Sequence, residues 1–219
     1  ITEYVQASKY AKEKNIHSQW SANEKTAMES ALGMSYAGKR SMVCMKHVGL
    51  NVAADAFVNS SITGVNGGLI VVSADDPSMH SSQNEQDSRF YGNFAMIPML
   101  EPVDQQEAYE MSYHGFELSE KFKLPVLLRV TTRLAHSRAG VQTLEQKPEN
   151  ENSFPSDLRQ FVLLPAIARK NYKNLLNAQA ALEAASEESK FNKYIDGSDK
   201  SLGIIAPGIA YNYLMENFQ

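Results

Sequence analysis

Three polar segments of this 219-residue chain carry side chains whose types and spacing could do chemistry. They are SANEK at residues 21–25, KHVGLN at 46–51 and HSSQNEQDSR at 80–89. A carboxylic acid such as Glu24, beside an apolar pocket, favours its protonated form and can share a proton with a ligand nitrogen. The same residue in the first turn of a helix also fits a structural role, in a capping box that begins at Ser21.

The second segment combines two basic side chains with small and amide residues. Lys46 and His47 by themselves fit a solvated loop as well as a binding site. Gly49 permits a close backbone approach, and Asn51 can cap the helix that follows. This combination at the mouth of a sheet favours a functional role.

The third segment is dense in hydrogen-bonding side chains and follows an apolar run. At the end of a buried strand, such a stretch favours binding or catalysis over simple solvation. Asp75 and Asp76 precede it and could ligate a metal. Neighbouring side chains in an extended run point apart, however, so a turn at Pro77 is the favoured interpretation.

The elements that must position these segments read as alternating strands and helices. The almost unbroken β-branched run at 67–76 is typical of a strand covered on both faces. Alternation at this spacing predicts an α/β fold, with a parallel sheet flanked by helices and right-handed crossovers. The expected strands are 16–20, 41–45, 67–76, 96–100 and 126–131, and the expected helices are 1–15, 25–38, 51–63 and 104–121.

The three polar segments each follow one of the first three expected strands. Ligands of open parallel sheets bind beyond the carboxyl ends of the strands, so we expect these segments to meet at that edge. After Arg133 the alternation breaks. A polar, proline-punctuated linker at 145–157, a long helix at 166–188 and a further strand with a glycine turn at 202–208 are expected to follow.

Composition excludes several classes of function. The chain has 21 Lys and Arg against 25 Asp and Glu, a mildly acidic balance without the basic footprint of a nucleic-acid-binding protein. It contains no apolar run of about 18 residues, so no membrane segment is expected. The single Cys44 excludes a disulfide framework and a cysteine-bound zinc or iron–sulfur site built from this chain alone. We expect a cytoplasmic protein.

Four stretches, in this order and spacing, resemble the larger (alpha) subunit of indolepyruvate-type enzymes in the thiamine-diphosphate-dependent 2-oxoacid:ferredoxin oxidoreductase family. They are WSANEKTAMESALGMSYAG, MKHVGLNVAAD, GGLIVVSADDP and HSSQNEQDSR. The resemblance continues through FELSEKFKLPVLLRVTTRLAHSR to LGIIAPGIAYNYL and so covers nearly the whole chain. The pair MKHVGLN and HSSQNEQDSR is its most specific part.

The resemblance implies a pyrimidine-binding domain, which holds the aminopyrimidine ring of the cofactor. The catalytic glutamate of the family falls on Glu24, whose carboxyl would hydrogen-bond a ring nitrogen. A cation suits a substrate carboxylate, and a histidine suits proton transfer. His47 and His80 are therefore further catalytic candidates, and the residues expected around cofactor and substrate are Lys46, Asn51, Gln83, Asn84 and Arg89; no metal ligand is expected.

The activity implied is oxidative decarboxylation of indolepyruvate to the acyl-CoA, with ferredoxin as electron acceptor. The implied cofactors are thiamine diphosphate with Mg²⁺, and [4Fe-4S] clusters and coenzyme A in the full enzyme. The implied partners are a smaller beta subunit and ferredoxin, with no nucleic acid and no membrane. Two alternatives stay open: the same chemistry on another 2-oxo acid, and a non-catalytic α/β module that binds a protein.

The resemblance also suggests how the chain is divided. Residues 1–145 are expected to form the pyrimidine-binding domain without its first strand, 146–199 a linker with the long helix, and 200–219 the opening of a second α/β domain. The chain begins without methionine and ends within an expected helix. We therefore expect a fragment that is inactive alone.

Overall fold

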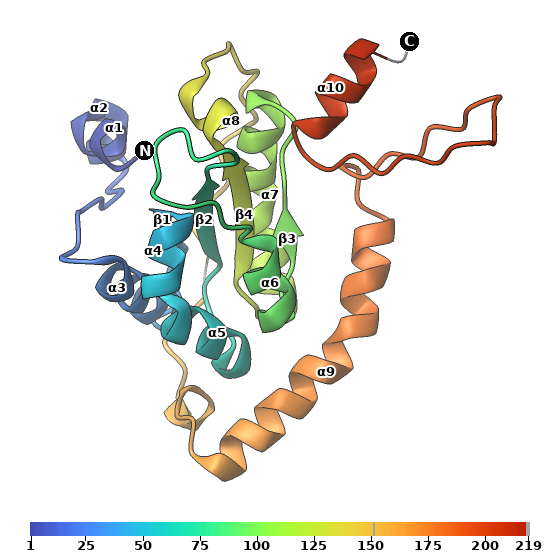
Figure 1. Cartoon of the computed structure of the whole chain (residues 1–219). Helices are drawn as coiled ribbons and strands as arrows, with labels where there is room; N and C mark the ends of the chain where they lie inside the picture. The colour runs from blue at the N-terminus through green and yellow to red at the C-terminus, as the bar shows by residue number, and fades with distance from the viewer. Residues whose placement is uncertain (151, 218–219) are drawn as a thin grey trace.

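A parallel four-stranded sheet forms the centre of the computed structural model, which describes residues 1–150 and 152–217 (Figure 1). Its order is β1-β2-β4-β3, and all three neighbouring pairs run parallel. The predicted α/β fold class is confirmed. The strands are β1 (Ser41–Lys46), β2 (Leu69–Asp75), β3 (Met99–Leu100) and β4 (Val126–Thr131).

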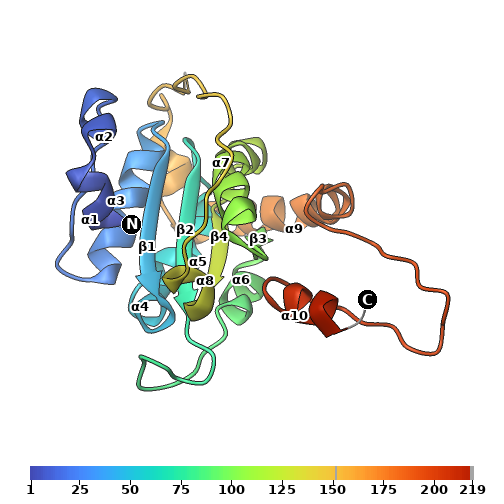
Figure 2. The ribbon, with the colours of Figure 1, turned by 90° about the horizontal axis from the view of Figure 1, so that it is seen from above.

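Helices cover both faces of the sheet (Figure 2). Along β2, Leu69 and Val71 point into one apolar cluster, while Ile70 and Val72 point into the other. Side chains of a strand alternate between faces, so a strand buried on both sides needs the unbroken apolar run seen here. The first cluster packs under α3 (Glu24–Tyr36), α5 (Ala54–Thr63) and α6 (Arg89–Ala95), and the second under α7 (Gln105–Phe122).

Two short helices sit at the carboxyl ends of the strands. α4 (His47–Val52) begins directly where β1 ends, and α8 (Thr132–His136) begins directly where β4 ends. An extended segment then runs along α7, where the Tyr113 hydroxyl donates to the Glu145 carbonyl at 2.7 Å and Lys147 Nζ to the Tyr113 carbonyl at 2.8 Å. These contacts hold the segment against α7.

The remaining elements lie outside the sheet layers. The predicted long helix is present as α9 (Pro165–Glu187), which begins with a proline at its first position and buries Leu175. Figure 1 shows it passing α5 and climbing along the side of the domain toward α10. The other outer elements are α1 (Thr2–Ala7), α2 (Lys9–Glu13), the 3-10 helix η1 (Leu158–Phe161) and α10 (Ala210–Asn217).

Two of the predicted strands are wrong. Residues 16–20 and 202–208 have no strand partner, and their large apolar side chains stay exposed, with Trp20 at 67% and Ile205 at 97%. A short apolar run predicts a strand only if a neighbouring strand accepts its hydrogen bonds. Residues 16–20 are tied instead to α1 by side chains, because Gln6 donates to the Ser18 carbonyl at 3.0 Å.

Smaller differences concern where elements begin and end. The predicted strand at 96–100 shrinks to two residues, because Met96 ends α6 in the left-handed region and Pro98 has no N–H to donate. The helix predicted at 1–15 is split at Ser8, whose hydroxyl accepts from the Ala11 N–H at 3.3 Å and caps α2. Over the described residues, no helix is both long and apolar enough to cross a membrane. Phe218 and Gln219, which end the last predicted helix, lie outside the described residues.

Candidate functional site

Glu24 stands at the carboxyl edge of the sheet although the strand predicted before it is absent. α3 packs against β1, and the two elements run in opposite directions. The second half of α3 lies beside the first residue of β1, where Ser41 Oγ donates to the Ala31 carbonyl at 2.8 Å. The N-terminus of α3 therefore lies beside the carboxyl end of β1. The predicted capping box at Ser21 is wrong, because the cap is Asn23, whose side chain accepts from the Thr26 N–H at 2.9 Å. Glu24 is thus the first residue of the helix and has no capping role to fill.

The Glu24 side chain rests on the backbone of Gly49. An ideal Cβ at position 49 would lie 2.6 Å from Glu24 Cγ and 2.9 Å from its Oε1. The close approach expected of this glycine is therefore an approach to the glutamate. Lys25 pairs with Glu29 at 3.9 Å, and within the described residues no donor reaches the half-buried Glu24 carboxylate.

The other predicted residues of the segment 46–51 bind the polar loop 77–88, which connects β2 to α6. Lys46 Nζ donates to the Ser81 carbonyl at 2.8 Å. Asn51 donates to Gln86 Oε1 at 2.5 Å. These contacts bring the second and third polar segments together, as expected.

His47 is buried between two backbone carbonyls. Nε2 lies 3.1 Å from the Asn84 carbonyl oxygen and Nδ1 lies 3.4 Å from that of Ala74. A neutral imidazole carries one N–H, so it donates to one of these acceptors at a time. The ring links β2 to the loop, and its catalytic role stays a prediction.

Asp75 and Asp76 bind the loop, and the turn favoured at Pro77 is present at residues 77 and 78. Both are almost fully buried. The Thr132 hydroxyl first, and then the backbone N–H groups of Ser81 and His80, hold the pKa of Asp76 well below its usual range, since they bind the charged form. Within the described residues, no three metal-ligating side chains gather into a cluster.

The loop itself is tightly turned. Ser78 and Met79 both adopt the left-handed region, with φ of 67° and 54°, in which side chains other than glycine are strained. The turn is closed by Met79 N–H, which donates to the Asp76 carbonyl at 3.0 Å, and Glu85 accepts from the Ser78 N–H at 3.0 Å. A loop that keeps such a conformation is held by its surroundings.

Three predicted residues of the third segment expose their side chains. His80 and Gln83 make no side-chain hydrogen bond within the described residues, and Asn84 Oδ1 accepts from Gln86 at 3.1 Å. Arg89 differs, because its guanidinium grips Asp87, with contacts between 2.6 and 2.9 Å. This hydrogen bond is the main reason why the pKa of Arg89 is raised and the pKa of Asp87 is lowered.

Arg129 was not among the residues predicted from sequence, yet it is the central cation of this edge. It is 6% exposed, donates from Nε to Asp75 at 2.6 Å and pairs with Glu101. An arginine within the apolar run VLLRVT is the signal that could have identified it, because a charge is rarely buried unless it is paired.

The chemistry of the free carboxylate fits the aminopyrimidine ring of thiamine diphosphate. Such a ring offers amino and ring-nitrogen groups, which need a partner with an uncommitted oxygen. Glu24 meets that need, since its oxygens are free within the described residues and it lies at a helix N-terminus beside a bare glycine backbone. The carboxylates of Asp75 and Asp76 do not, because donors of the protein already occupy them.

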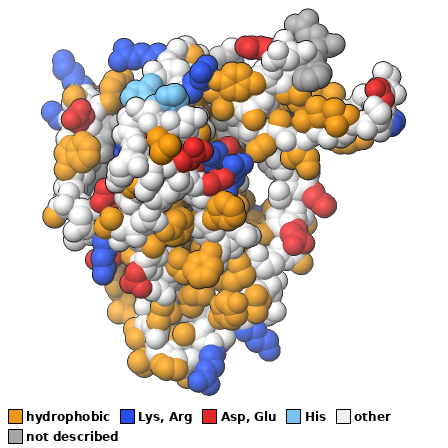
Figure 3. All heavy atoms as spheres, viewed as in Figure 1, with side chains coloured by type: hydrophobic (Ala, Val, Ile, Leu, Met, Phe, Trp, Pro, Cys, Tyr) orange, Lys and Arg blue, Asp and Glu red, His pale blue; other side chains and the backbone are white. Residues whose placement is uncertain are grey.

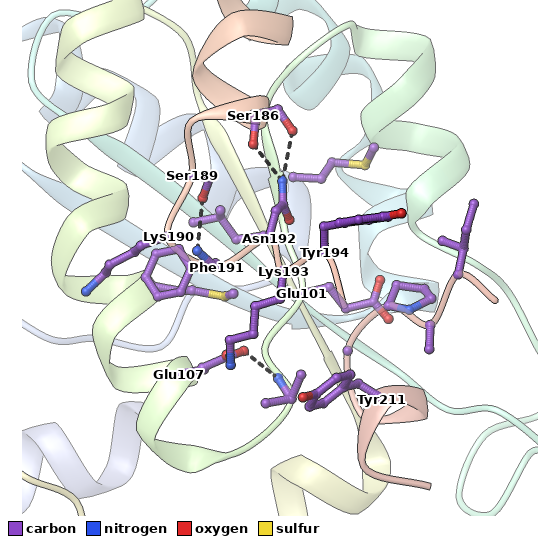
Figure 4. A pocket seen from close by; sticks show the side chains of 18 of the residues that line it. Glu101, Glu107, Ser186, Ser189, Lys190, Phe191, Asn192, Lys193, Tyr194 and Tyr211 are labelled. Carbon is purple, nitrogen blue, oxygen red and sulfur yellow. Dashed lines mark hydrogen bonds and ion pairs between the residues drawn. The ribbon is translucent and has the colours of Figure 1, made fainter. Parts of the chain in front are cut away.

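A cavity of about 2040 Å³ lies elsewhere, between the β3 edge and residues 189–215 (Figure 4). Lys193, Tyr194 and Tyr211 point into this region, and of the predicted site residues its wall includes Arg89. On the face shown in Figure 3, apolar side chains gather below a group of acids and bases. Phe90 and Phe94 of α6 are among the exposed apolar side chains of the molecule.

The fold and this edge define a cofactor-binding α/β domain, and comparison with known proteins gives its class. The family model described as "Pyruvate flavodoxin/ferredoxin oxidoreductase, thiamine diP-bdg" matches residues 2–188. The chain belongs to this family of thiamine-diphosphate-binding domains.

The curated relatives carry one name. The chain is 46% identical over 208 residues to "Indolepyruvate oxidoreductase subunit IorA" of Methanothermobacter thermautotrophicus, covering 94% of this chain and 34% of the relative. It is 46% identical over 214 residues to the protein of the same name from Thermococcus kodakarensis, covering 94% and 33%. The chain thus spans about a third of the length of the curated relatives it matches.

A solved structure shares the fold. A chain of the 2-oxoglutarate:ferredoxin oxidoreductase from Magnetococcus marinus, solved with 2-oxoglutarate, coenzyme A and succinyl-CoA bound, superposes with a TM-score of 0.60. The match covers 91% of this chain and 42% of that one at 16% sequence identity. At this identity, the likeness confirms the fold.

Proposed function

We propose that the protein to which this chain belongs oxidatively decarboxylates indolepyruvate or a similar aryl 2-oxo acid. In this proposal the chain supplies the aminopyrimidine half of a thiamine diphosphate site. The family match and the name shared by its relatives support the reaction class and the substrate. The observation that carries the proposal is the half-buried Glu24 carboxylate, free on the backbone of Gly49 at the carboxyl edge of the sheet.

Glu24 would hold and exchange a proton with a nitrogen of the cofactor ring. The first turn of α3 directs the positive end of the helix dipole toward this position, where a negatively charged ligand or side chain is stabilised. Gly49 sets the position of the side chain by leaving room for it. When bound, thiamine diphosphate supplies the electron sink that the decarboxylation of a 2-oxo acid requires.

Other components of the reaction lie with the longer protein. We propose that Mg²⁺ and the diphosphate group bind a second domain, and that coenzyme A, [4Fe-4S] clusters, ferredoxin and a smaller subunit take part in the complete enzyme, which is cytoplasmic. On this chain, the exposed side chains of His80, Gln83 and Asn84 are the candidates for contact with the substrate. Lys46, His47, Asn51 and Arg89 would shape the site through the loop or through Asp87.

The test compares two glutamates of the same helix in the complete enzyme. Glu24→Gln keeps the shape of the side chain and removes its proton exchange, so reduction of a viologen dye by indolepyruvate should fall by about 100-fold or more. Glu29→Gln is the matched control, because Glu29 is exposed and pairs only with Lys25 among the described residues. Full turnover by Glu24→Gln would remove Glu24 from the mechanism and favour a non-catalytic, protein-binding module.

Substrate choice has its own measurement. Indolepyruvate, phenylpyruvate, pyruvate and 2-oxoglutarate should be compared by kcat/KM in the same dye assay. The proposal expects the highest value with indolepyruvate. A preference for a small or dicarboxylic substrate would keep the reaction class and replace the substrate.

A further inference from the structure

The loop 77–88 is held at both of its ends by two neighbouring residues. Asp75 ends β2 and Asp76 follows it, after which the chain leaves the sheet and returns at Arg89 to begin α6 (Figure 1). Neighbouring side chains at the end of a strand point in opposite directions. Two adjacent carboxylates can therefore reach two separate parts of one loop.

Asp76 holds the outgoing end. Its Oδ1 accepts from the His80 N–H at 3.1 Å, and its Oδ2 accepts from the Ser81 N–H at 2.7 Å. The Thr132 hydroxyl, at the start of α8, donates to Oδ1 at 2.7 Å. With Asp76 1% exposed, water does not compete for these donors.

Asp75 holds the returning end. Its Oδ2 accepts from the Ser88 N–H at 2.9 Å and from Arg129 Nε at 2.6 Å. Its Oδ1 accepts from the Ser73 hydroxyl at 3.2 Å. The charge is fully buried and is balanced by a buried arginine. Apolar residues often serve the stability of a core as well as such a buried pair does, so the pair is better explained by what it orients.

The middle of the loop is attached to the helix that supports Glu24. Within α4 and at its start, Lys46 and His47 contact residues 81 and 84 of the loop, and Gly49 contacts Glu24. A six-residue helix is about 9 Å long, so the loop and Glu24 share one short, rigid support.

We propose that Asp75 and Asp76 are positioning residues that fix the loop 77–88 and thereby present His80 and Gln83 to the carboxylate and 2-oxo group of the substrate. The inference rests on the proposed function, and assigns the loop side of the site to the substrate and the Glu24 side to the cofactor. His80 and Gln83 suit that role because their side chains are exposed and make no hydrogen bond within the described residues.

The experiment uses the complete enzyme with its partner subunit. Asp76→Asn places an amide N–H against the donors of the loop, and Thr132→Val removes one of those donors while Asp76 remains. Both should raise KM for the 2-oxo acid by about tenfold or more, since small displacements of positioned groups have large kinetic effects. Thr132→Ser restores the hydroxyl and should restore KM. The matched control is Asp55→Asn, because Asp55 is exposed and contacts Asn59 of its own helix.

A second readout separates positioning from folding. If Asp76 acts through the loop, replacing His80 and Gln83 by alanine in the Asp76→Asn enzyme should add little to the loss, since coupled residues are not additive. The affinity for thiamine diphosphate, measured by calorimetry, should remain unchanged in these variants. Additive losses, or equal losses of cofactor affinity and substrate KM, would overturn the inference.

The two proposals fail in different ways. An inactive Glu24→Gln enzyme beside unaffected Asp76→Asn and Thr132→Val enzymes would leave the proposed function in place and remove the positioning role. A fully active Glu24→Gln enzyme would remove the proposed function itself. If Asp76→Asn does not fold, Thr132→Val and its serine counterpart still decide the question.

Discussion

Two groups of carboxylates at the same edge of one sheet have opposite surroundings. Glu24 is half-buried and has no protein donor within the described residues, whereas Asp75 and Asp76 are buried and bound by hydroxyl, guanidinium and backbone N–H groups. The comparison shows how one kind of side chain serves two purposes. A carboxylate occupied by the protein holds the structure, and one left free is available to a ligand.

Removing the partner of the buried Asp75 should have the largest effect on stability. Arg129→Met would leave the buried Asp75 and the partly buried Glu101 without their main partner, so the free energy of unfolding should fall by about 3–5 kcal/mol. Thermal and urea unfolding of the purified protein measure this change. The matched control is Arg159→Met, because the Arg159–Asp157 pair at 2.8 Å is exposed, and exposed ion pairs contribute little to stability. Equal effects of the two variants would contradict the structural role assigned to the buried carboxylates.

Displacing the free carboxylate of Glu24 should lower activity rather than stability. Gly49→Ala places a Cβ 2.6 Å from Glu24 Cγ, and the flexible glutamate side chain, rather than the backbone, will move. Under the proposed function, we expect turnover to fall by about 10²-fold, because a small displacement of a reacting group has a large kinetic effect, while the unfolding temperature stays nearly unchanged.

Gly33→Ala is the control for this variant. Gly33 lies on the same helix as Glu24, and an added Cβ there meets nothing within 4 Å. Alanine favours a helix over glycine by about 1 kcal/mol, so this variant should be slightly more stable and fully active. Unchanged activity in both variants would show that Gly49 does not set the position of Glu24.

The smallest effect concerns pH. The donors around Asp76, led by the Thr132 hydroxyl, lower its pKa in the folded state. The ionised carboxylate therefore adds stability at pH values above the pKa that an aspartate has in the unfolded chain, about 3.9. That stability is lost as the pH falls below this value toward the folded pKa. Thr132→Val weakens the effect, so it should destabilise the protein at neutral pH and less so in acid.

Melting temperatures measured from neutral pH down to about pH 3, below the ordinary pKa of an aspartate, test this prediction. The difference between the native protein and Thr132→Val should narrow toward the acid end. A difference that stays constant with pH would show that Thr132 acts through packing and not through the charge of Asp76.

Much of the sheet was predictable because its residues repeat with clear periods. The unbroken apolar run of β2 and the short run of β1 predicted strands in the right places, and α3, α7 and α9 began and ended close to the predicted residues. The strands expected at 16–20 and 202–208 failed for a shared reason. Five to seven residues with some apolar side chains form a strand only beside another strand, which a local pattern does not reveal.

The polar segments were recognisable in the same way, but the contacts within them were not. Residue types placed Lys46, His47 and Asn51 near a site, and the structure shows them holding the backbone and a side chain of the loop. The role of Arg129 was not predicted, because its partners lie on three other segments of the chain. Burial and pairing of charges depend on what folds next to them.

The amino-acid sequence by itself determined the α/β class, the parallel sheet, the convergence of polar segments at its carboxyl edge and the family likeness centred on Glu24. These follow from side-chain periodicity and from short motifs, which are local properties. Only the tertiary structure decided which carboxylate is free and which are occupied, because that depends on donors brought from α8, β4 and the start of α6. The division of labour between Glu24 and the pair Asp75 and Asp76 is therefore a property of the folded chain.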